Sequence, residues 1–394
     1  MKNLETLIQE LCPDGVEFVK LGEVCEIKTG KGITQKDCSE SSKYPVYSGG
    51  KEPMGYYKEF NRNANTVTVS RVGAYAGFVN YVTEDFYLND KCFSVLPQKD
   101  EDINSKYLYY KLKALECSII NMQSGGGVPT INTKKVGSLE IPLPPIEVQT
   151  EIVRILDKFT SLEAELEAEL DCRKRQYEYY RDKLLSFDNV GGQEVEWKKM
   201  SEVFDMRNGY TPSKTKAEYW EGGTIPWFRM EDIRENGRIL SDSIQHITMV
   251  GVKKGKLFPA NSFILATTAT IGEHALVIAD SLANQQFTNL TVRNSLSNRL
   301  LIKFVFHYMF IVDEWCKKNI NVSGFASVDM NKFKKLEFPI PSLEEQHRIV
   351  SILDRFESLT TSLQSGLPAE IAARRQQYEH YRDKLLTFKR KGAA

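Results

Sequence analysis

Two long stretches of the chain repeat their apolar side chains at helical spacing. Between residues 147 and 187 there is no Gly or Pro, and helix-forming residues dominate. Ile152 and Phe159 stand on one heptad row of this stretch, and Leu156 and Leu170 stand on the other. The pattern predicts one long helix with a single apolar seam, and such a seam needs a partner to be stable in water.

The second stretch begins with the same seam and then loses its phase. Ile349 and Leu353 start the rows, which resume four residues late at Ile371. A four-residue step is a stutter, which locally unwinds a coiled coil. Gly366 and Pro368 stand where the phase is lost. We therefore expect a break there, with Pro368 opening a new helical segment.

Before each of these stretches lies a body with mostly strand-like patterning. Residues 66–82 alternate apolar and polar positions around a Gly-containing turn, which predicts two strands, and residues 87–96 predict a third. Residues 105–123 carry the helical pattern of this first body. The second body repeats the plan at 261–279, 284–293 and 299–318. Both bodies are thus predicted to be mixed and mostly β.

The chain is a tandem repeat. Residues 141–159 (IPLPPIEVQTEIVRILDKF) align without a gap with residues 338–356 (FPIPSLEEQHRIVSILDRF). Residues 173–187 (RKRQYEYYRDKLLSF) match residues 374–388 (RRQQYEHYRDKLLTF). An opening block is shared as well, VEFVKLGEVCEIKTG in the first copy and VEWKKMSEVFDMRNG in the second. The order is opening block, variable body, proline block and long helix, and then all of it again.

This order predicts an α+β fold with two mixed, mostly β domains, each followed by a long helix. The short link between the copies favours antiparallel packing of the two helices as a coiled coil, with pseudo-two-fold symmetry. The expected segments are a first domain at 1–144, a first helix at 145–188, a second domain at 189–341 and a second helix at 342–394.

Composition narrows the class of protein. The chain has 394 residues, no formal net charge and 41% apolar residues, which is typical of a globular protein with more than one domain. No run of 18 apolar residues occurs, so no transmembrane helix is expected. The seven cysteines are scattered without a CxxC pair, which favours a reducing compartment and indicates a cytoplasmic protein.

The sequence lacks the motifs of familiar catalytic sites. It contains no phosphate-binding GxxxxGK[ST] loop, no GxSxG nucleophile turn and no glycine-rich dinucleotide fingerprint. The five histidines never stand at metal-ligand spacing. We therefore expect no catalytic residue and no metal in this chain.

Polar side chains at turns and strand ends are the remaining functional signal. Acidic residues outnumber basic ones in the first helix, whereas basic residues outnumber acidic ones in the second body. Arg and Lys contact phosphates or guanine, and Asn and Gln pair with adenine in the major groove. The residues that we expect to contact DNA are Lys51, Arg71, Tyr75, Lys91, Gln123, Thr211, Lys214, Arg229, Thr267, Asn284, Gln285 and Gln286.

The repeated blocks resemble those of the specificity subunits of type I restriction–modification systems. The resemblance rests on VEF and VEW before each body, residues 209–213 (GYTPS), 225–227 (IPW) and 284–287 (NQQF), and the QYEYYRDKLL and QYEHYRDKLL motifs. It covers nearly the whole chain. It implies two target recognition domains, each reading one half of a split, asymmetric DNA target, and a coiled coil that fixes the spacer between the halves.

The resemblance also implies partners. Two modification (methyltransferase) subunits would bind the helices, and restriction (motor and nuclease) subunits would join them. S-adenosylmethionine, ATP and Mg²⁺ would belong to those partners, so this chain would be a non-catalytic subunit without a cofactor of its own. The residues that we expect to contact the methyltransferase subunits are Gln149, Tyr177, Tyr180, Arg181, Gln346, Tyr378, Tyr381 and Arg382.

Two other functions compete with this interpretation. A single-chain enzyme that fuses recognition to methyl transfer or cleavage would need a methyl-donor loop or a nuclease motif, and the sequence shows neither. A purely structural coiled-coil scaffold would not explain why two differing bodies stand on one repeated frame.

Overall fold

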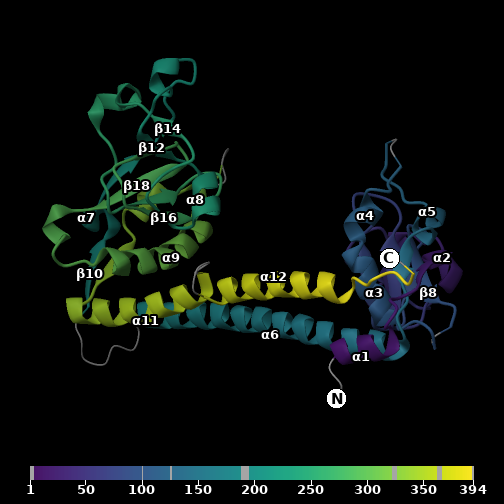
Figure 1. Cartoon of the computed structure of the whole chain (residues 1–394). Coiled ribbons are helices and arrows are strands. Elements are labelled where there is room, and N and C mark those ends of the chain that lie inside the picture. The colour runs from purple at the N-terminus through teal and green to yellow at the C-terminus, as the bar shows by residue number, and fades with distance from the viewer. Residues whose placement is uncertain are drawn as a thin grey trace. The chain divides into compact units, whose positions relative to one another are not determined.

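The computed structural model describes residues 4–99, 101–124, 127–187, 195–321, 326–361 and 366–392. The chain forms two compact units (Figure 1). Unit 1 comprises residues 1–168 and 369–394, and unit 2 comprises residues 169–368. Each unit therefore combines one body with helical segments from both repeats, and the compact units divide the chain differently from the four sequence segments.

Unit 1 contains three small sheets. A four-stranded antiparallel sheet has the order β2-β8-β5-β6, a three-stranded sheet has the order β4-β3-β7, and β1 pairs with β9. Its strands are β1 (Phe18–Lys20), β2 (Cys25–Thr29), β3 (Tyr44–Tyr47), β4 (Tyr56–Tyr57), β5 (Thr66–Ser70), β6 (Val79–Val82), β7 (Tyr87–Leu88), β8 (Cys92–Pro97) and β9 (Glu140–Pro142). All five residues of β5 are buried, as expected for a strand that lies between two others in the sheet.

Short helices complete the body of unit 1. They are α1 (Leu4–Leu11), α2 (Leu21–Val24), η1 (Gln35–Asp37), α3 (Ser105–Ala114), α4 (Glu116–Ile120) and α5 (Thr133–Gly137). Helix α3 begins at a cap in which the Asn104 side chain accepts from the backbone amides of Lys106 and Tyr107. Leu108 and Leu112 of α3 are buried in one core with Val67 and Val69 of β5.

Unit 2 repeats these sheets in a larger form. A five-stranded sheet has the order β11-β18-β15-β16-β13, a three-stranded sheet has the order β14-β12-β17, and β10 pairs with β21 and β19 with β20. Its strands are β10 (Glu196–Lys199), β11 (Phe204–Asn208), β12 (Ile225–Phe228), β13 (Ile239–Leu240), β14 (His246–Ile247), β15 (Ser262–Ala266), β16 (His274–Val277), β17 (Leu282–Ala283), β18 (Phe287–Val292), β19 (Ile320–Asn321), β20 (Ser327–Val328) and β21 (Glu337–Ile340).

The helices of the second body are α7 (Met200–Val203), η2 (Ala217–Tyr219), α8 (Met230–Asn236), η3 (Met249–Gly251), η4 (Lys253–Gly255), η5 (Asn294–Leu296), α9 (Ile302–Lys318) and α10 (Met330–Phe333). The connection from β12 to β15 is longer than its unit 1 counterpart from β3 to β5, and the extra residues form α8, β13, η3 and η4. The two-strand prediction for 66–82 is confirmed by β5 and β6, and that for 261–279 by β15 and β16.

The prediction of one strand at 87–96 is wrong. This segment forms β7 and β8, which belong to different sheets, and residues 89–91 turn the chain between them. The second body has the same break, because residues 284–286 separate β17 from β18. The predicted strand at 284–293 therefore starts only at Phe287.

The long helices are α6 (Ile146–Leu185), α11 (Leu343–Thr361) and α12 (Leu367–Leu385). The predicted break in the second helix is confirmed, and Pro368 is the second residue of α12. Within unit 1, Phe159 of α6 stacks on Tyr381 of α12, and Arg375 of α12 pairs with Glu163 and Glu167 of α6. These pairs run in opposite directions along the two helices, so the helices are antiparallel there.

Unit 2 holds its own pair of long-helix segments. Tyr180 of α6 stacks on Phe356 of α11, with ring centroids 5.6 Å apart. Leu185 shares one buried core with Ile349 and Leu353 of α11. In each unit the apolar seam is therefore buried against a helix of the other repeat.

No helix in the described part of the chain is long and apolar enough to cross a membrane.

Candidate nucleic-acid interface

The turn that follows β7 is built around one asparagine. The Asn89 side chain accepts from the Lys91 backbone amide at 3.2 Å and donates to the Ile33 carbonyl at 2.7 Å. The Arg71 backbone amide, just after β5, donates to the Lys91 carbonyl at 2.7 Å. Hydrogen bonds thus fix the turn 89–91 against the loop that begins at Arg71.

Unit 2 contains the same frame with different side chains. The Asn284 side chain accepts from the Gln286 backbone amide at 3.0 Å, and the Thr267 amide donates to the Gln286 carbonyl at 2.9 Å. The repeat places Gln285 and Gln286 where unit 1 has Asp90 and Lys91. One backbone arrangement therefore presents amide groups in one unit and charged groups in the other.

A glycine lets each turn approach the end of the neighbouring strand. A Cβ on Gly30, just after β2, would lie 2.2 Å from the Leu88 carbonyl oxygen and 2.4 Å from that of Asn89. Gly209, just after β11, would meet the Asn284 and Ala283 carbonyl oxygens at 2.2 and 2.4 Å. No side chain fits at such distances, so both positions require glycine.

The expected DNA contacts of unit 1 lie around the loop 71–77. The Lys51 ammonium stands 5.4 Å from the ring centre of Tyr75, which is 48% exposed. Gln123 donates from its side chain to the Ala76 carbonyl at 2.8 Å. The structure therefore brings Lys51, Tyr75 and Gln123 together beside Arg71 and Lys91.

A hollow of about 420 Å³ opens next to this loop. Its lining is polar and includes Arg71, Thr29, Ser124 and Asn132. The Arg71 guanidinium donates to the Asp90 carbonyl at 3.3 Å and is partly exposed, and Arg71 lines this hollow. Such a recess is suited to a base edge or a phosphate.

In unit 2 the structure joins Thr211 to the turn 284–286. The Thr211 hydroxyl donates to the Gln285 side-chain oxygen at 2.6 Å, and the Asn284 amide donates to the Gln286 side-chain oxygen at 3.2 Å. These bonds orient the two glutamine amides before any ligand is present. Lys214 is exposed on the same loop as Thr211.

Two of the expected DNA contacts of unit 2 are partly or largely buried. Thr267 is 6% exposed, and its hydroxyl lies 3.0 Å from that of Thr288, so little of its side chain is open to a ligand and its contact with DNA stays a prediction. Arg229 lies over the Trp227 ring at 5.8 Å, with its Nε buried and 3.9 Å from the Glu231 carboxylate. This packing directs much of the Arg229 side chain inward.

Gln149 and Gln346, two of the residues expected to contact a methyltransferase subunit, lie in the interior of this chain. Both are fully buried. Gln149 donates to the Asp102 and Pro144 carbonyls, each at 2.8 Å, and accepts from the Asn104 amide at 2.9 Å. A buried amide has to satisfy its hydrogen bonds inside the protein, and this one ties the proline block to the start of α3.

Gln346 makes the same set of bonds in unit 2. It donates to the Arg299 and Pro341 carbonyls at 2.8 and 2.9 Å and accepts from the Leu301 amide at 2.8 Å. These two residues are therefore structural. They set each body on its long helix.

The remaining expected partner contacts are divided between the interior and the surface. Tyr177 packs edge-on against Phe310, and the Arg181 guanidinium lies 5.0 Å over the same ring, with 11% of its side chain exposed. In unit 1, Arg382 lies 5.8 Å over Tyr378 in the same way. These four predicted residues mainly support the packing of the helices.

The side chains of Tyr180 and Tyr381 remain partly exposed to solvent. Each is 42% exposed while one face stacks on a phenylalanine of the other repeat. Tyr179, which is not among the expected partner contacts, is 61% exposed and makes an edge contact with Tyr180. Its signal was an aromatic residue outside both heptad rows, where a helix faces solvent.

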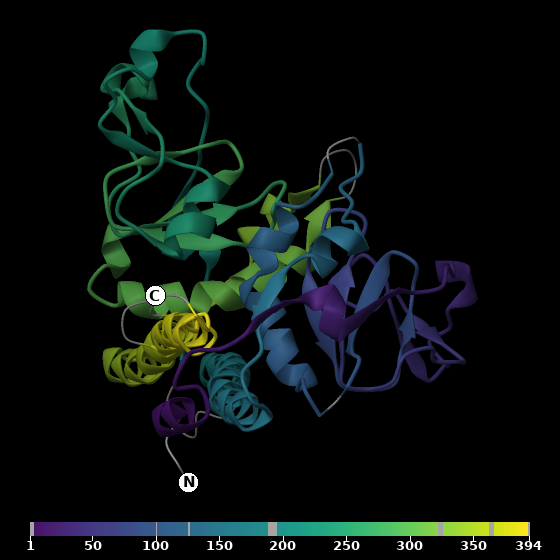
Figure 2. The same ribbon diagram turned by 45° about the vertical axis from the view of Figure 1, so that its right-hand side comes forward.

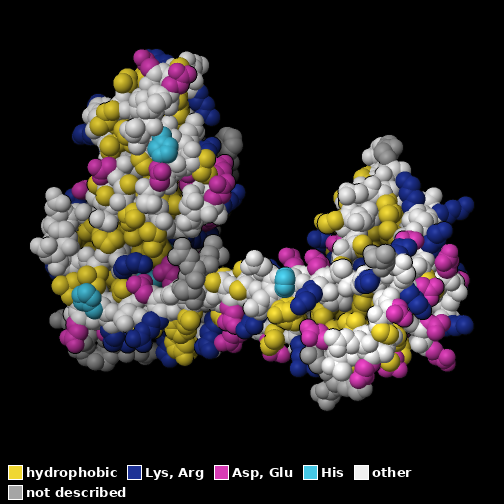
Figure 3. Space-filling model, viewed as in Figure 1, with side chains coloured by type: hydrophobic (Ala, Val, Ile, Leu, Met, Phe, Trp, Pro, Cys, Tyr) yellow, Lys and Arg dark blue, Asp and Glu magenta, His cyan; other side chains and the backbone are white. Residues whose placement is uncertain are grey.

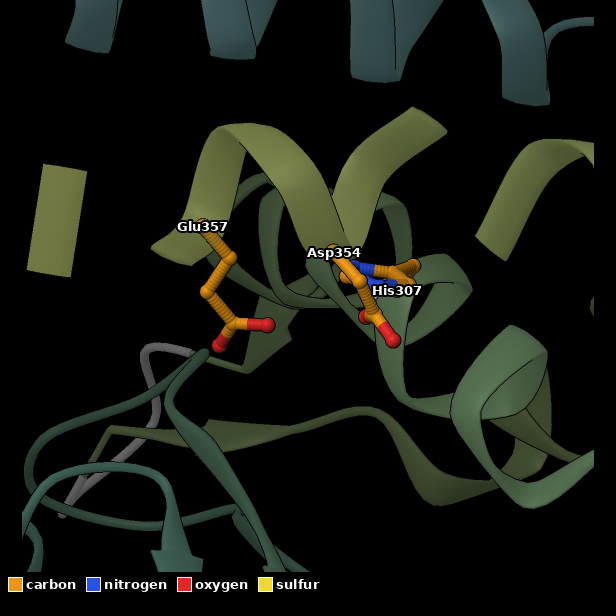
Figure 4. A group of neighbouring side chains, drawn as sticks. All are labelled: His307, Asp354 and Glu357. Carbon is orange, nitrogen blue, oxygen red and sulfur yellow. Dashed lines mark hydrogen bonds and ion pairs between the residues drawn. The ribbon is translucent and has the colours of Figure 1, made fainter. Parts of the chain in front are cut away.

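One group in the described part of the chain has the donor set of a metal site. His307 of α9 and Asp354 and Glu357 of α11 place one ligand atom each within 4.8 Å of one another (Figure 4). His307 Nε2 lies 2.8 Å from Asp354, and its Nδ1 lies 3.4 Å from the Tyr177 hydroxyl. The Lys303 ammonium lies 3.6 Å from Asp354 and 3.9 Å from Glu357, so this cation partly neutralises the two carboxylates.

Unit 1 has the same arrangement without a histidine. The Asp157 carboxylate accepts from the Tyr110 hydroxyl at 2.6 Å and from the Lys106 ammonium at 2.8 Å. Thr160 takes the place of Glu357. The shared part is a lysine–aspartate pair with one ring donor, and we name it the helix clamp of each unit. It attaches the body helix to the long helix, and spacing within the sequence could not show it, because its residues come from two helices.

Burial shifts the pKa values of the unit 2 clamp. Desolvation lowers the pKa of His307, although its hydrogen bond to Asp354 acts in the opposite direction. Desolvation also raises the pKa of Glu357, although Lys303 opposes this shift. The neutral imidazole therefore has one nitrogen facing Asp354 and one facing Tyr177.

These features define a class of protein: two bodies on one repeated frame, each presenting a different set of polar side chains on the same turn. The family of type I restriction modification DNA specificity domains matches residues 13–171 and 193–373, and the chain belongs to this family.

Relatives cover the chain at full length. The chain is 35% identical to the EcoR124I/EcoR124II specificity subunit of Escherichia coli, over 98% of this chain and 97% of that one. It is 54% identical to the EcoprrI specificity subunit of Escherichia coli over 53% of each chain. The fold matches a type I restriction–modification S subunit from M. genitalium at 17% identity, with a TM-score of 0.55 over 94% of this chain and 96% of that one.

Proposed function

We propose that this chain is the DNA-recognition subunit of a type I restriction–modification complex. Each unit would read one half of a split, asymmetric target with its body. The observation that carries this proposal is the shared turn, which has Asp90 and Lys91 in unit 1 and Gln285 and Gln286 in unit 2. A lysine pairs with guanine and a glutamine with adenine, so one frame with two sets of side chains can read two sequences.

Partners would supply the chemistry. Two modification subunits would bind the long helices, and restriction subunits would join them, with S-adenosylmethionine, ATP and Mg²⁺ held by those partners. The exposed rings of Tyr179, Tyr180 and Tyr381 give the helices an aromatic surface for such contacts. The chain would then act in the cytoplasm as a non-catalytic subunit.

The long helices would form one antiparallel coiled coil that fixes the spacer between the half-sites. The contacts inside each unit support this proposal, since Phe159 stacks on Tyr381 and Tyr180 stacks on Phe356. The helix clamps and the buried Gln149 and Gln346 hold each body on its helix, so a change in helix length would be passed on to the reading surfaces.

Methylation mapping tests the proposal. The full chain is expressed with its modification subunits in a host that lacks other methyltransferases, and the methylated motif is read from the genome. We expect a two-part motif. Exchanging residues 210–326 for the segment of another family member should change one half of it and leave the other half and the spacer unchanged. A change in both halves would contradict independent reading.

A further inference from the structure

Unit 2 carries an exposed loop that the base-reading turn does not explain. Helices η3 and η4 with Lys256 form what we call the 249–256 platform, and unit 1 has no counterpart for it. At its tip, Met249 is 55% exposed and Val250 is 68% exposed. An apolar pair displayed this openly is unfavourable in water and is typical of a contact surface.

The platform is rigidly supported. Gly251 is buried, and a Cβ there would lie 3.2 Å from the Tyr219 Cβ. The Thr248 amide donates to the Tyr219 carbonyl at 2.9 Å, and the Thr248 hydroxyl donates to the Glu218 carbonyl at 2.7 Å. The tip is therefore held outward by a fixed base.

The platform shares its support with the base-reading turn. The Lys253 backbone amide donates to the Tyr210 hydroxyl at 2.5 Å, and the Lys253 ammonium lies 4.4 Å over the Tyr210 ring. The Tyr210 amide in turn donates to the Ala283 carbonyl at 2.9 Å, next to the turn 284–286. Thr211, which follows Tyr210, holds the Gln285 side chain. The platform and the turn 284–286 are thus linked through Tyr210 and Thr211.

The charge of the platform fits a polyanion. Lys253, Lys254 and Lys256 are exposed, and residues 249–260 contain no Asp or Glu. Lys254 has a φ of 55°, a left-handed conformation that costs a non-glycine residue energy and is often kept where function requires it. On the end of unit 2 where β12 and β14 lie, hydrophobic, basic and acidic side chains all occur (Figures 1 and 3), so the basic character belongs to the segment 249–260 itself.

We propose that the 249–256 platform is a DNA wedge, an inference that rests on the proposed function. Met249 and Val250 press into a base step beside the bases read by the turn 284–286 and unstack it, while Lys254 and Lys256 contact the flanking phosphates. Apolar wedges flanked by basic residues unstack duplex steps in this way. The wedge would give unit 2 sensitivity to the deformability of a step that it does not read by hydrogen bonds.

The experiment uses the full chain co-purified with its modification subunits. The probe is a duplex of about 40 base pairs that carries the motif found by methylation mapping, with 2-aminopurine placed in turn at each position in and beside the half-site of unit 2. We expect fluorescence to rise at one step on binding, because an unstacked 2-aminopurine is less quenched. The double variant Met249→Ala, Val250→Ala should lose most of this rise.

Two further variants separate the wedge from its surroundings. Ile278→Ala removes an apolar side chain that is 45% exposed elsewhere in unit 2, and it should keep the full rise. Lys254→Ala with Lys256→Ala should reduce the slope of log affinity against log salt by about two. Thermal unfolding of every variant checks that the fold is retained.

Other results would overturn the wedge. An equal rise with and without Met249 and Val250, or no rise at any position, contradicts it, even if the lysine variant changes the salt slope. Failure of the double variant to co-purify with the modification subunits would show that the tip binds protein instead of DNA. A wild-type complex that does not bind its own motif would refute the proposed function itself.

Discussion

At the residue scale, the two helix clamps differ at two positions, with His307 and Glu357 in unit 2 where unit 1 has Tyr110 and Thr160. Burial lowers the pKa of His307 below its ordinary value of 6.5, so the folded state prefers the neutral ring. This preference stabilises the folded state at pH values above the pKa that the histidine has in the unfolded chain. The stabilisation is lost as the pH falls through the lower pKa that His307 has in the folded protein. We therefore expect the junction between α9 and α11 to loosen below about pH 6.5, with no such change between α3 and α6.

Hydrogen exchange at pH 7.5 and pH 5.5 measures this difference on peptides from residues 302–318 and 105–114. The raised pKa of Glu357 acts in the opposite sense, because protonation of a buried carboxyl in acid favours the folded state. His307→Tyr, which places the ring residue of the unit 1 clamp at this position, isolates the contribution of the histidine and should remove the acid sensitivity. Unchanged exchange of residues 302–318 between the two pH values in the wild type would contradict the prediction.

A second residue-scale prediction concerns Asp313, which is buried in unit 2. Its carboxylate lies 2.7 Å from His274 Nδ1 and 3.2 Å from an Arg238 nitrogen. Replacing Asp313 by Ala removes the carboxylate that faces His274 Nδ1, while Arg238 keeps its bond to the His274 carbonyl at 3.0 Å. We expect a loss of about 3–5 kcal/mol of unfolding free energy, because the buried ion pair is broken. Glu314→Ala is the matched control, because its pair with Lys317 is about half exposed and should be worth no more than about 1 kcal/mol. Denaturant titration compares the unfolding free energies of the two variants. Equal losses would show that the buried ion pair contributes no more than the exposed one.

At the element scale, periodicity predicted helices well and turns poorly. The heptad rows gave α6 and the break before Pro368, because a helix repeats its environment over many turns. The strand predicted at 87–96 was wrong because a side chain, Asn89, closes a turn in the middle of an apolar run. The burial of Gln149 and Thr267 could not be predicted for a related reason. A polar residue type does not show whether the protein or the solvent satisfies its hydrogen bonds.

The turns 89–91 and 284–286, which we propose to read bases, give an element-scale prediction. Gly30→Ala would place a methyl group 2.2 Å from the Leu88 carbonyl oxygen, so β2 and the turn 89–91 must separate. We expect a folded protein in which the half-site read by unit 1 is relaxed or lost while the other half-site persists. Gly50→Ala is the control, since the nearest atom lies 3.6 Å from its Cβ and the backbone needs no unusual φ. Methylation mapping reads both outcomes, and an unchanged motif in Gly30→Ala would remove the turn from the reading surface.

At the scale of the whole molecule, the tandem repeat alone predicts the architecture of two bodies and two long helices. Each half of the chain supplies a long helix whose apolar seam is too exposed to be stable alone, and each compact unit buries that seam with a helix from the other half. This exchange explains why the compact units do not follow the sequence segments. The repeat predicts that each apolar seam packs against the helix of the other half. The position of each side chain on the proposed reading surfaces depends on the turns, and only the structure shows it.

The last prediction follows from the length of α6, which runs without interruption from Ile146 to Leu185. Four added residues lengthen a helix by about 6 Å, which corresponds to about two base pairs of duplex at about 3.4 Å each. Inserting four residues within 160–171 should therefore lengthen the spacer between the half-sites and leave the bases of both half-sites unchanged. Methylation mapping of the insertion variant measures spacer and half-sites together.

Two results of that mapping would contradict the prediction in different ways. An unchanged spacer in an active variant means that the helices bury one another without setting the distance between the half-sites. Changed half-site bases mean that the bodies do not read independently, because the insertion lies outside both reading turns, 89–91 and 284–286. A longer spacer with the original bases requires that the helix clamps hold each body rigidly on its helix, so that a longer helix moves the two reading surfaces apart. Asp157→Ala weakens the helix clamp of unit 1. In the insertion variant, this substitution should give methylated sites with a mixture of spacer lengths.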